Sequence, residues 1–258
     1  MLQPLSKFIF LSSLWMFSLH THAESVVWDE QQTSADLQRQ IAASQINALN
    51  SDQQSFLTLQ RTAMTPFVKG TAILVPDWSQ HAASPRAVEY LRNYLIDFGW
   101  NTVAMMVPPA VTETSTENLL SYQQKLLARL KIVMAEAEAK PGTIVVIGLG
   151  HSGALLNQLY KNEELSAPQA LVLIGAAMQD VTLNEQVAEA LSQHKVPTLD
   201  LLPQSDNTFA RNSGSLRLQL VRKHIKEIYR QRLLPGSVEQ DHPWLAREIL
   251  GWLRYIGY

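Results

Sequence analysis

The feature of this sequence that most constrains its fold is the stretch TIVVIGLGHSGALL, residues 143–156. Residues 143–147 are all β-branched, and a run of this kind favours a buried strand. Glycines follow, and then an apolar segment that is compatible with a helix. A buried strand that turns sharply into a helix is typical of α/β proteins, in which ligands bind at the carboxyl ends of the strands. We therefore expect a functional site at or near this turn.

One interpretation of the turn is a nucleophile elbow, small-x-Ser-x-small, running from Gly150 to Ala154 with Ser152 at its tip. An elbow holds its central residue in a strained conformation, so the residues two before and two after it must be small. In this frame the backbone N–H of Gly153 lies at a helix N-terminus, where it would donate to an oxyanion.

Two other interpretations of the same residues are open. Residues 148–153 match GxGxxG, the dinucleotide-binding pattern, which requires an acidic residue at the end of the next strand to bind the ribose. The next predicted strand, 170–174, is followed by no carboxylate before Asp180, so this interpretation ranks low. In the last interpretation the elbow frame is 148–152, with Gly150 at the tip. Ser152 is then a helix N-cap, and the elbow carries no nucleophile.

Composition limits the class of protein. The 258 residues are 46% hydrophobic and 17% charged, which suits a single medium-sized domain with a sizeable core. The net charge of −2 argues against a surface devoted to nucleic acid or to anionic membranes. The chain has no cysteine, so it forms no disulfide and carries no lipoprotein anchor.

The N-terminus has the pattern of a secretory signal peptide. Lys7 precedes an uncharged apolar run, residues 8–19, and small residues precede the predicted cleavage point near Ala23. The run is short for a membrane span. We predict that residues 1–23 are removed and that the mature chain, without a transmembrane span, is periplasmic or secreted. An uncleaved anchor is the alternative.

The next segment is polar and rich in glutamine. From Ser34 its apolar residues fall at helical spacing: Leu37, Ile41, Ala42, Ile46 and Leu49. This predicts an amphipathic helix. The expected organisation is therefore a signal peptide (1–23), an N-terminal helical extension (24–55) and one α/β domain (56–258).

Strands and helices alternate through the rest of the chain. The predicted strands are 56–61, 69–75, 101–107, 143–147, 170–174, 196–202 and 229–234. The predicted helices between and after them are 85–99, 119–139, the one following the elbow, 183–194, 216–228 and 243–253. This alternation predicts an α/β fold, a mostly parallel sheet with helices on both faces.

If Ser152 is a nucleophile, an acid and then a histidine must follow on loops after later strands. Asp206 lies on the loop after strand 196–202, and His242 lies after the last strand, directly before the final helix. The imidazole would remove the serine proton, and the carboxylate would fix the tautomer of the imidazole. Asp200 is a rival acid, but it lies inside a strand, where we expect it to face a helix or to be paired. The remaining histidines of the domain are expected on the surface or in packing contacts: His151, His194 and His224.

Several segments resemble the α/β-hydrolase superfamily: GTAILVP, LRNYLIDFGWNTVAMMVPP, VVIGLGHSGA, VPTLDLLPQSDN and a histidine before a helix that ends in GWL. The resemblance covers residue 56 to the C-terminus and implies the α/β-hydrolase fold. More narrowly, the chain resembles a bacterial exported family called domain of unknown function 3530, which is α/β-hydrolase-like.

The chain departs from the superfamily at the end of the second predicted strand. Hydrolases usually have His-Gly there, whereas this chain has Pro76, Asp77 and Trp78. The second oxyanion donor would be a backbone N–H of Asp77 or Trp78, because proline has none. The link from Ile174 to Leu183 is short, so we expect no large cap domain.

Two functional hypotheses follow. The first is a serine hydrolase that acts on a small-molecule ester, thioester or amide through Ser152, Asp206 and His242, without a cofactor or a metal. The second is a catalytically inactive protein of the same fold that binds a cell-envelope component or a protein partner.

Overall fold

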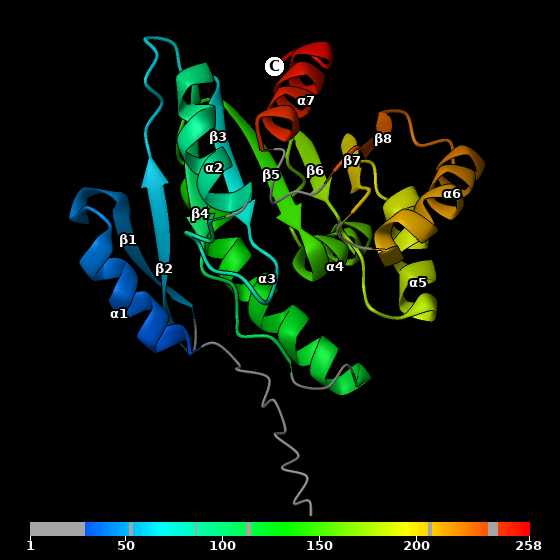
Figure 1. Ribbon diagram of the computed structural model, residues 1–258, viewed down its shortest axis with the longest axis horizontal. Helices are drawn as coiled ribbons and strands as arrows, with labels where there is room; N and C mark the ends of the chain where they lie inside the picture. Colours follow the sequence, from blue (N-terminus) through cyan, green and yellow to red (C-terminus); the bar gives the residue numbers. More distant parts are fainter. Residues whose placement is uncertain (1–28, 52–53, 86, 112–114, 206–207, 237–241) are drawn as a thin grey trace, which may run out of the picture.

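The computed structural model describes residues 29–51, 54–85, 87–111, 115–205, 208–236 and 242–258. The predicted signal peptide and Asp206 lie outside these residues. The described residues form an eight-stranded sheet in the order β1-β2-β4-β3-β5-β6-β7-β8 (Figure 1). The strands are β1 (Ile46–Ser51), β2 (Gln54–Arg61), β3 (Gly70–Val75), β4 (Trp100–Met105), β5 (Thr143–Leu149), β6 (Ala170–Ile174), β7 (Thr198–Pro203) and β8 (Tyr229–Leu234).

The sheet is mostly parallel, as the sequence predicts. β2 runs antiparallel to β1 and to β4, whereas the remaining neighbouring pairs, from β4 and β3 to β7 and β8, are parallel. Every residue of β3, β6 and β7 is buried. Strands that are buried on both faces have largely apolar sequences, and such sequences predict buried strands.

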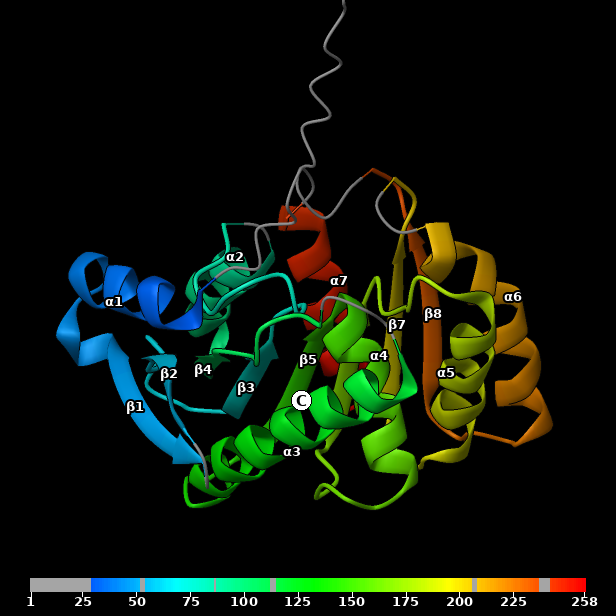
Figure 2. The same ribbon diagram turned by 90° about the horizontal axis from the view of Figure 1, so that it is seen from below.

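Helices cover both faces of the sheet (Figures 1 and 2). α2 and α7 lie together on one face, and α3, α4, α5 and α6 form a row on the other. The helices are α1 (Glu30–Gln40), α2 (Ala87–Tyr94), α3 (Thr116–Glu138), α4 (Gly150–Lys161), α5 (Val181–Gln193), α6 (Thr208–Lys223) and α7 (His242–Tyr255), with short 3-10 helices η1 (Ala43–Gln45) and η2 (Leu95–Phe98). This architecture is the α/β-hydrolase fold.

The predicted N-terminal helix is wrong in its second half. α1 begins at Glu30, where the Asp29 carboxylate caps it by accepting the N–H groups of residues 31 and 32, and it ends at Gln40. Ile46 and Leu49 belong to β1 instead, because the chain pairs there with β2 as an antiparallel hairpin. The expected boundary between 55 and 56 therefore falls inside β2, and the sheet begins at Ile46.

The predicted helix 216–228 is shifted relative to α6, which spans Thr208–Lys223. The polar segment 211–215 has low helix propensity, but packing offsets it. A Cβ on Gly214 would lie 2.8 Å from Leu202 Cδ1, so a glycine lets the helix approach β7 closely. The helix ends before Ile225, which has a left-handed φ of +52°.

The link between β6 and α5 is short, residues 175–180, so no cap domain is inserted there. Within the part of the chain that the structure describes, no helix is long and apolar enough to cross a bilayer.

Candidate functional site

The turn between β5 and α4 has Gly150 at its tip. Leu149 is extended, and Gly150 has a φ of +51°, a left-handed conformation that glycine adopts without a steric penalty. The residues two before and two after this tip are Gly148 and Ser152. A Cβ on Gly148 would lie 2.6 Å from Leu156 Cδ1 and 2.9 Å from Gly153 Cα, so this position also requires glycine. The frame 148–152 therefore describes the turn.

The carboxylate of Asp77 occupies the space beside the tip. A Cβ placed on Gly150 would lie 2.5 Å from both the Cγ and the Oδ1 of Asp77. Asp77 Oδ1 accepts the backbone N–H of His151 at 2.7 Å. In a hydrolase elbow the N–H that follows the tip stabilises the oxyanion. Here that donor is already engaged by a carboxylate of the same chain.

Asp77 and His151 also interact through their side chains. His151 Nδ1 lies 3.0 Å from Asp77 Oδ1, and the hydroxyl of Ser79 donates to Asp77 Oδ2 at 2.9 Å. Burial acts to raise the pKa of the Asp77 carboxyl, but the hydrogen bonds and charge of His151 and the bond from Ser79 outweigh it, so the pKa is lowered. The carboxylate is held in its ionised form.

Aromatic rings enclose this pair. Trp78 stacks on the His151 ring with centroids 3.9 Å apart, and Tyr122 meets Trp78 edge-on at 5.6 Å. His151 Nε2 is buried and has no hydrogen-bond partner among the described residues.

Ser152 lies inside the protein. It is fully buried, and its Oγ lies 3.0 Å from the Oη of Tyr122 on α3. Burial raises the pKa of Tyr122, so the phenol stays protonated. His242 begins α7, where its ring lies 5.3 Å from the ring of Tyr90 on α2. Within the described residues, no hydrogen bond joins Ser152 to His242.

Gly153 is a packing residue of α4. A Cβ there would lie 2.7 Å from the carbonyl oxygen of Gly148, so the glycine allows the helix to contact the strand. Because Leu149 is the N-cap, the Gly153 N–H is the first in α4 with an intrahelical acceptor. Asp180, the carboxylate considered for a dinucleotide, is the N-cap of α5 and accepts the N–H of Leu183 at 2.8 Å.

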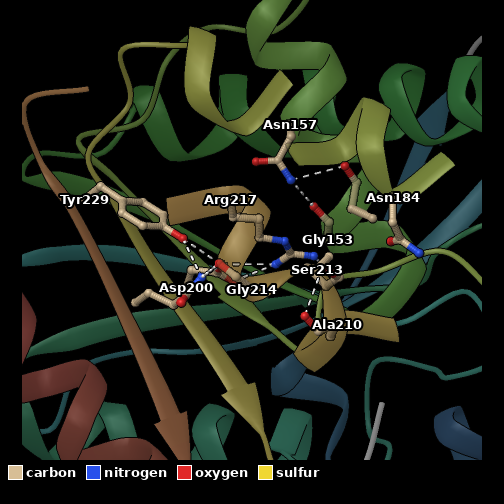
Figure 3. A network of polar contacts seen from close by, with 12 residues as sticks. Gly153, Asn157, Asn184, Asp200, Ala210, Ser213, Gly214, Arg217 and Tyr229 are labelled. Carbon is tan, nitrogen blue, oxygen red and sulfur yellow. Dashed lines mark hydrogen bonds and ion pairs between the residues drawn. The ribbon is translucent and has the colours of Figure 1, made fainter. Parts of the chain in front are cut away.

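Asp200 is paired, as predicted for an acid inside a strand. Figure 3 shows its carboxylate beside the guanidinium of Arg217 from α6, with N–O distances of 2.9 and 3.1 Å. Tyr229 on β8 donates to the same carboxylate at 2.8 Å. Arg217 also donates to the Ala176 carbonyl and thereby ties the loop after β6 to β7. Both charged side chains are fully buried.

The other histidines make packing contacts. His194 is buried, with Nδ1 3.1 Å from Lys226 Nζ and Nε2 3.2 Å from Asn157 Oδ1. His224 Nδ1 lies 2.7 Å from the Ser192 hydroxyl. His151 also packs, but its pairing with Asp77 was missed. The pairing depends on the order of strands in the sheet, because β3 and β5 are parallel neighbours and the residues after their carboxyl ends meet.

A cavity of about 720 Å³ lies beside this cluster, at the carboxyl end of β4. Tyr122 forms part of its wall and so connects it to Ser152. Its lining is Ser51, Gln54, Pro108, Pro109, Ala110, Val111, Asn118, Ser121, Tyr122, Gln124, Lys125, Ala128 and Arg129. Among the described residues, no group of three or more His, Asp or Glu side chains is arranged to hold a metal ion.

Comparisons with solved structures place the fold among hydrolases. Est1E from Butyrivibrio proteoclasticus, with ferulic acid bound, has a TM-score of 0.62 at 11% identity and covers 81% of this chain and 98% of its own. TT1662 from Thermus thermophilus has a TM-score of 0.60 at 15% identity, with 81% and 96% covered. XC6422 from Xanthomonas campestris, described as an α/β serine hydrolase without a lid, has a TM-score of 0.58 at 14% identity, with 83% and 96% covered.

A search of curated proteins found no match. A family model matches residues 20–118 and 108–255, nearly the whole chain. The chain therefore belongs to the family described as protein of unknown function (DUF3530).

Proposed function

We propose that this protein binds a small molecule at the carboxyl edge of its sheet and does not cleave it through an elbow nucleophile. The observation that carries the proposal is the tip of the elbow, where Gly150 has no side chain and Asp77 fills the adjacent space. An acyl substrate would also find the His151 N–H already bound to a carboxylate. A site arranged in this way offers neither a nucleophile at the tip nor a free oxyanion donor after it.

The cavity next to Tyr122 is the favoured binding site. Its volume of about 720 Å³ suits a small organic ligand. Its wall combines an apolar side, residues 108–111, with polar side chains of α3 that include Lys125. The relative Est1E has ferulic acid bound, so a phenolic carboxylate is a suitable first probe.

The catalytic question is tested by labelling the mature protein with a fluorophosphonate probe. We expect no labelling of the wild type, of Ser152→Ala or of His242→Ala. The predicted triad of Ser152, Asp206 and His242 is the competing hypothesis. Stoichiometric labelling that both substitutions abolish would establish the triad and overturn the proposal.

The binding site is tested by calorimetry with ferulate. We expect saturable binding that Lys125→Met weakens, because the ammonium would pair with the carboxylate of the ligand. Lys131→Met is the matched control, since Lys131 is exposed on the same helix but does not line the cavity. Equal affinities in all three proteins would exclude the cavity as the ferulate site.

We also propose that the protein is exported, on the evidence of the signal-like residues 1–23. Cell fractionation and N-terminal sequencing test this. We expect a mature chain that begins near residue 24 in the periplasm or the medium, whereas an intact N-terminus in the membrane fraction would indicate an uncleaved anchor. In either compartment, a cell-envelope component or a protein partner is the alternative to a small molecule as the ligand.

A further inference from the structure

The loop between β2 and β3, residues 62–69, projects from the body of the molecule at the amino end of β3 (Figure 1). It exposes three apolar side chains near its tip: Met64 at 70%, Phe67 at 75% and Val68 at 38%. Phe98 at the end of η2 is 36% exposed. The following Gly99 contacts the loop, since a Cβ there would lie 3.1 Å from the Phe67 carbonyl oxygen. We call these four side chains, which lie on two neighbouring segments, the apolar tip.

Hydrogen bonds hold the loop in a defined shape. The N–H of Met64 donates to the Ile96 carbonyl at 2.9 Å, and the N–H of Lys69 donates to the Gly99 carbonyl at 2.8 Å. Within the loop, the Thr65 hydroxyl donates to the Phe67 carbonyl at 2.7 Å. The apolar side chains are therefore exposed on a loop whose backbone is held by hydrogen bonds to η2 and Gly99. An apolar group that is held outward in this way points to a partner.

Basic side chains flank the tip. Arg61 and Lys69 are at the two ends of the loop, and Lys140 lines the same hollow of about 440 Å³ as Arg61 and Met64. Asp97 is an acid next to Phe98. The three basic residues place cations at the two ends of the loop and in the hollow beside it, although the net charge of the whole chain is −2. Whole-chain charge describes the average surface and misses a patch of this size.

We propose that this loop is a peripheral membrane anchor that inserts its apolar tip into the interface of an anionic lipid bilayer. The tip exposes an apolar area on the order of 400 Å², within the range of the largest patch on an ordinary monomer. A stable protein interface needs about 800 Å² from each partner. A bilayer needs no complementary surface, and apolar side chains with cations beside them match its interface.

The proposed membrane contact is independent of the proposed ligand site. The loop precedes β3, whereas Asp77 follows it, so the two features lie at opposite ends of the strand. Contact of the loop with a membrane would leave the carboxyl edge of the sheet open to solvent.

The test uses the mature chain and vesicles of phosphatidylethanolamine and phosphatidylglycerol, compared with vesicles of phosphatidylcholine alone. We expect co-sedimentation with the anionic vesicles, and a bound fraction that falls roughly tenfold in Met64→Ser/Phe67→Ser because binding scales with inserted apolar area. The two substitutions should leave the melting temperature unchanged, because both side chains are exposed. Leu233→Ser, an exposed apolar side chain on β8, is the control that should bind as the wild type does.

Insertion itself is tested with Phe67→Trp, a conservative change, and vesicles of brominated lipid. We expect additional fluorescence quenching relative to the wild type in Phe67→Trp and none in Val181→Trp, which is exposed at the start of α5, at the carboxyl edge of the sheet. Absence of vesicle binding, unchanged binding in the double variant, or equal quenching at both positions would overturn the proposal. A dimer in sedimentation velocity that the double variant converts to a monomer would assign the loop to a second copy instead.

Discussion

At the scale of single residues, Gly150 and Asp77 are a coupled pair. The left-handed φ at position 150 favours glycine, and the absence of a Cβ makes room for the carboxylate that binds the His151 N–H. A side chain at position 150 and the present position of Asp77 exclude one another. The elbow retains the backbone shape of a hydrolase while the space for its nucleophile is filled from the loop after β3.

This coupling predicts that Gly150→Ala lowers the free energy of unfolding by about 2–4 kcal/mol, from the unfavourable φ together with the collision with Asp77. In an Asp77→Gly background we expect a smaller loss of about 1–2 kcal/mol, since the φ cost alone remains. Urea denaturation of the wild type, Gly150→Ala, Asp77→Gly and the double variant measures the coupling. Gly251→Ala is the control, because its Cβ would meet nothing within 4 Å in α7 and should stabilise by up to about 1 kcal/mol. Equal losses in both backgrounds would contradict the coupling.

At the scale of elements, a buried ion pair joins β7, α6 and β8. Arg217 and Asp200 are both fully buried, and Tyr229 shares the carboxylate. We expect Arg217→Met to destabilise the protein by about 3–5 kcal/mol, since it leaves a buried carboxylate without its cation. Arg232→Met, which breaks a pair with Glu248 at the surface, should cost less than about 1 kcal/mol. Chemical denaturation measures the loss of unfolding free energy in both variants. Similar losses would show that the buried pair contributes no more to stability than the surface pair.

A second element-scale contact links α5 to the turn before β8 through His194 and Lys226. Burial lowers the pKa of Lys226 to about 7, and burial and then Lys226 lower the pKa of His194 to about 3. Between about pH 7 and the ordinary lysine pKa near 10.5, the unfolded chain binds more protons at Lys226 than the folded chain does. Stability from this group therefore rises with pH across that window.

The corresponding experiment compares the wild type with Lys226→Met. We expect the free energy of unfolding of the wild type, minus that of the variant, to increase between about pH 7 and about pH 10. Loss of the hydrogen bond to His194 adds an offset that does not depend on pH in this window. A difference that stays flat across the window would contradict the lowered pKa of Lys226.

At the scale of the whole molecule, α1 is joined to the domain by a buried contact. Arg129 on α3 pairs with Glu30 at 2.6 and 2.9 Å, donates to the Met106 carbonyl at 3.0 Å and lies over the Phe56 ring. We expect Glu30→Gln to lower the melting temperature and to expose α1 to limited proteolysis, because the guanidinium keeps its burial and loses its anion. Asp36→Asn, which breaks an exposed pair with Arg39 in the same helix, should change neither. Unchanged proteolysis in both variants would mean that apolar packing alone holds α1.

The sequence by itself predicted the fold class and most of the sheet. β3, β5 and β6 are almost continuous apolar runs, and β7 is apolar around Asp200, because helices bury both faces of these strands. Such runs can be recognised without any partner. The missing cap and the paired state of Asp200 also followed from local patterns. Local patterns predicted the wrong structure for the second half of the N-terminal helix and the wrong limits for α6. Apolar residues at 46 and 49 fit both a helix and a strand, and only the hairpin with β2 distinguishes them.

The conformation of the elbow followed only from the tertiary structure. Whether Gly150 or Ser152 occupies the tip depends on one φ angle, and the local sequence is compatible with either frame. The contacts of Asp77 with His151 join residues 74 positions apart, and they arise because β3 and β5 are neighbours in the sheet. Local sequence sets the conformations that each residue can adopt at low cost. Long-range packing selects among them. Here it places the Asp77 carboxylate beside the tip of the elbow, where the sequence had suggested the hydroxyl of Ser152.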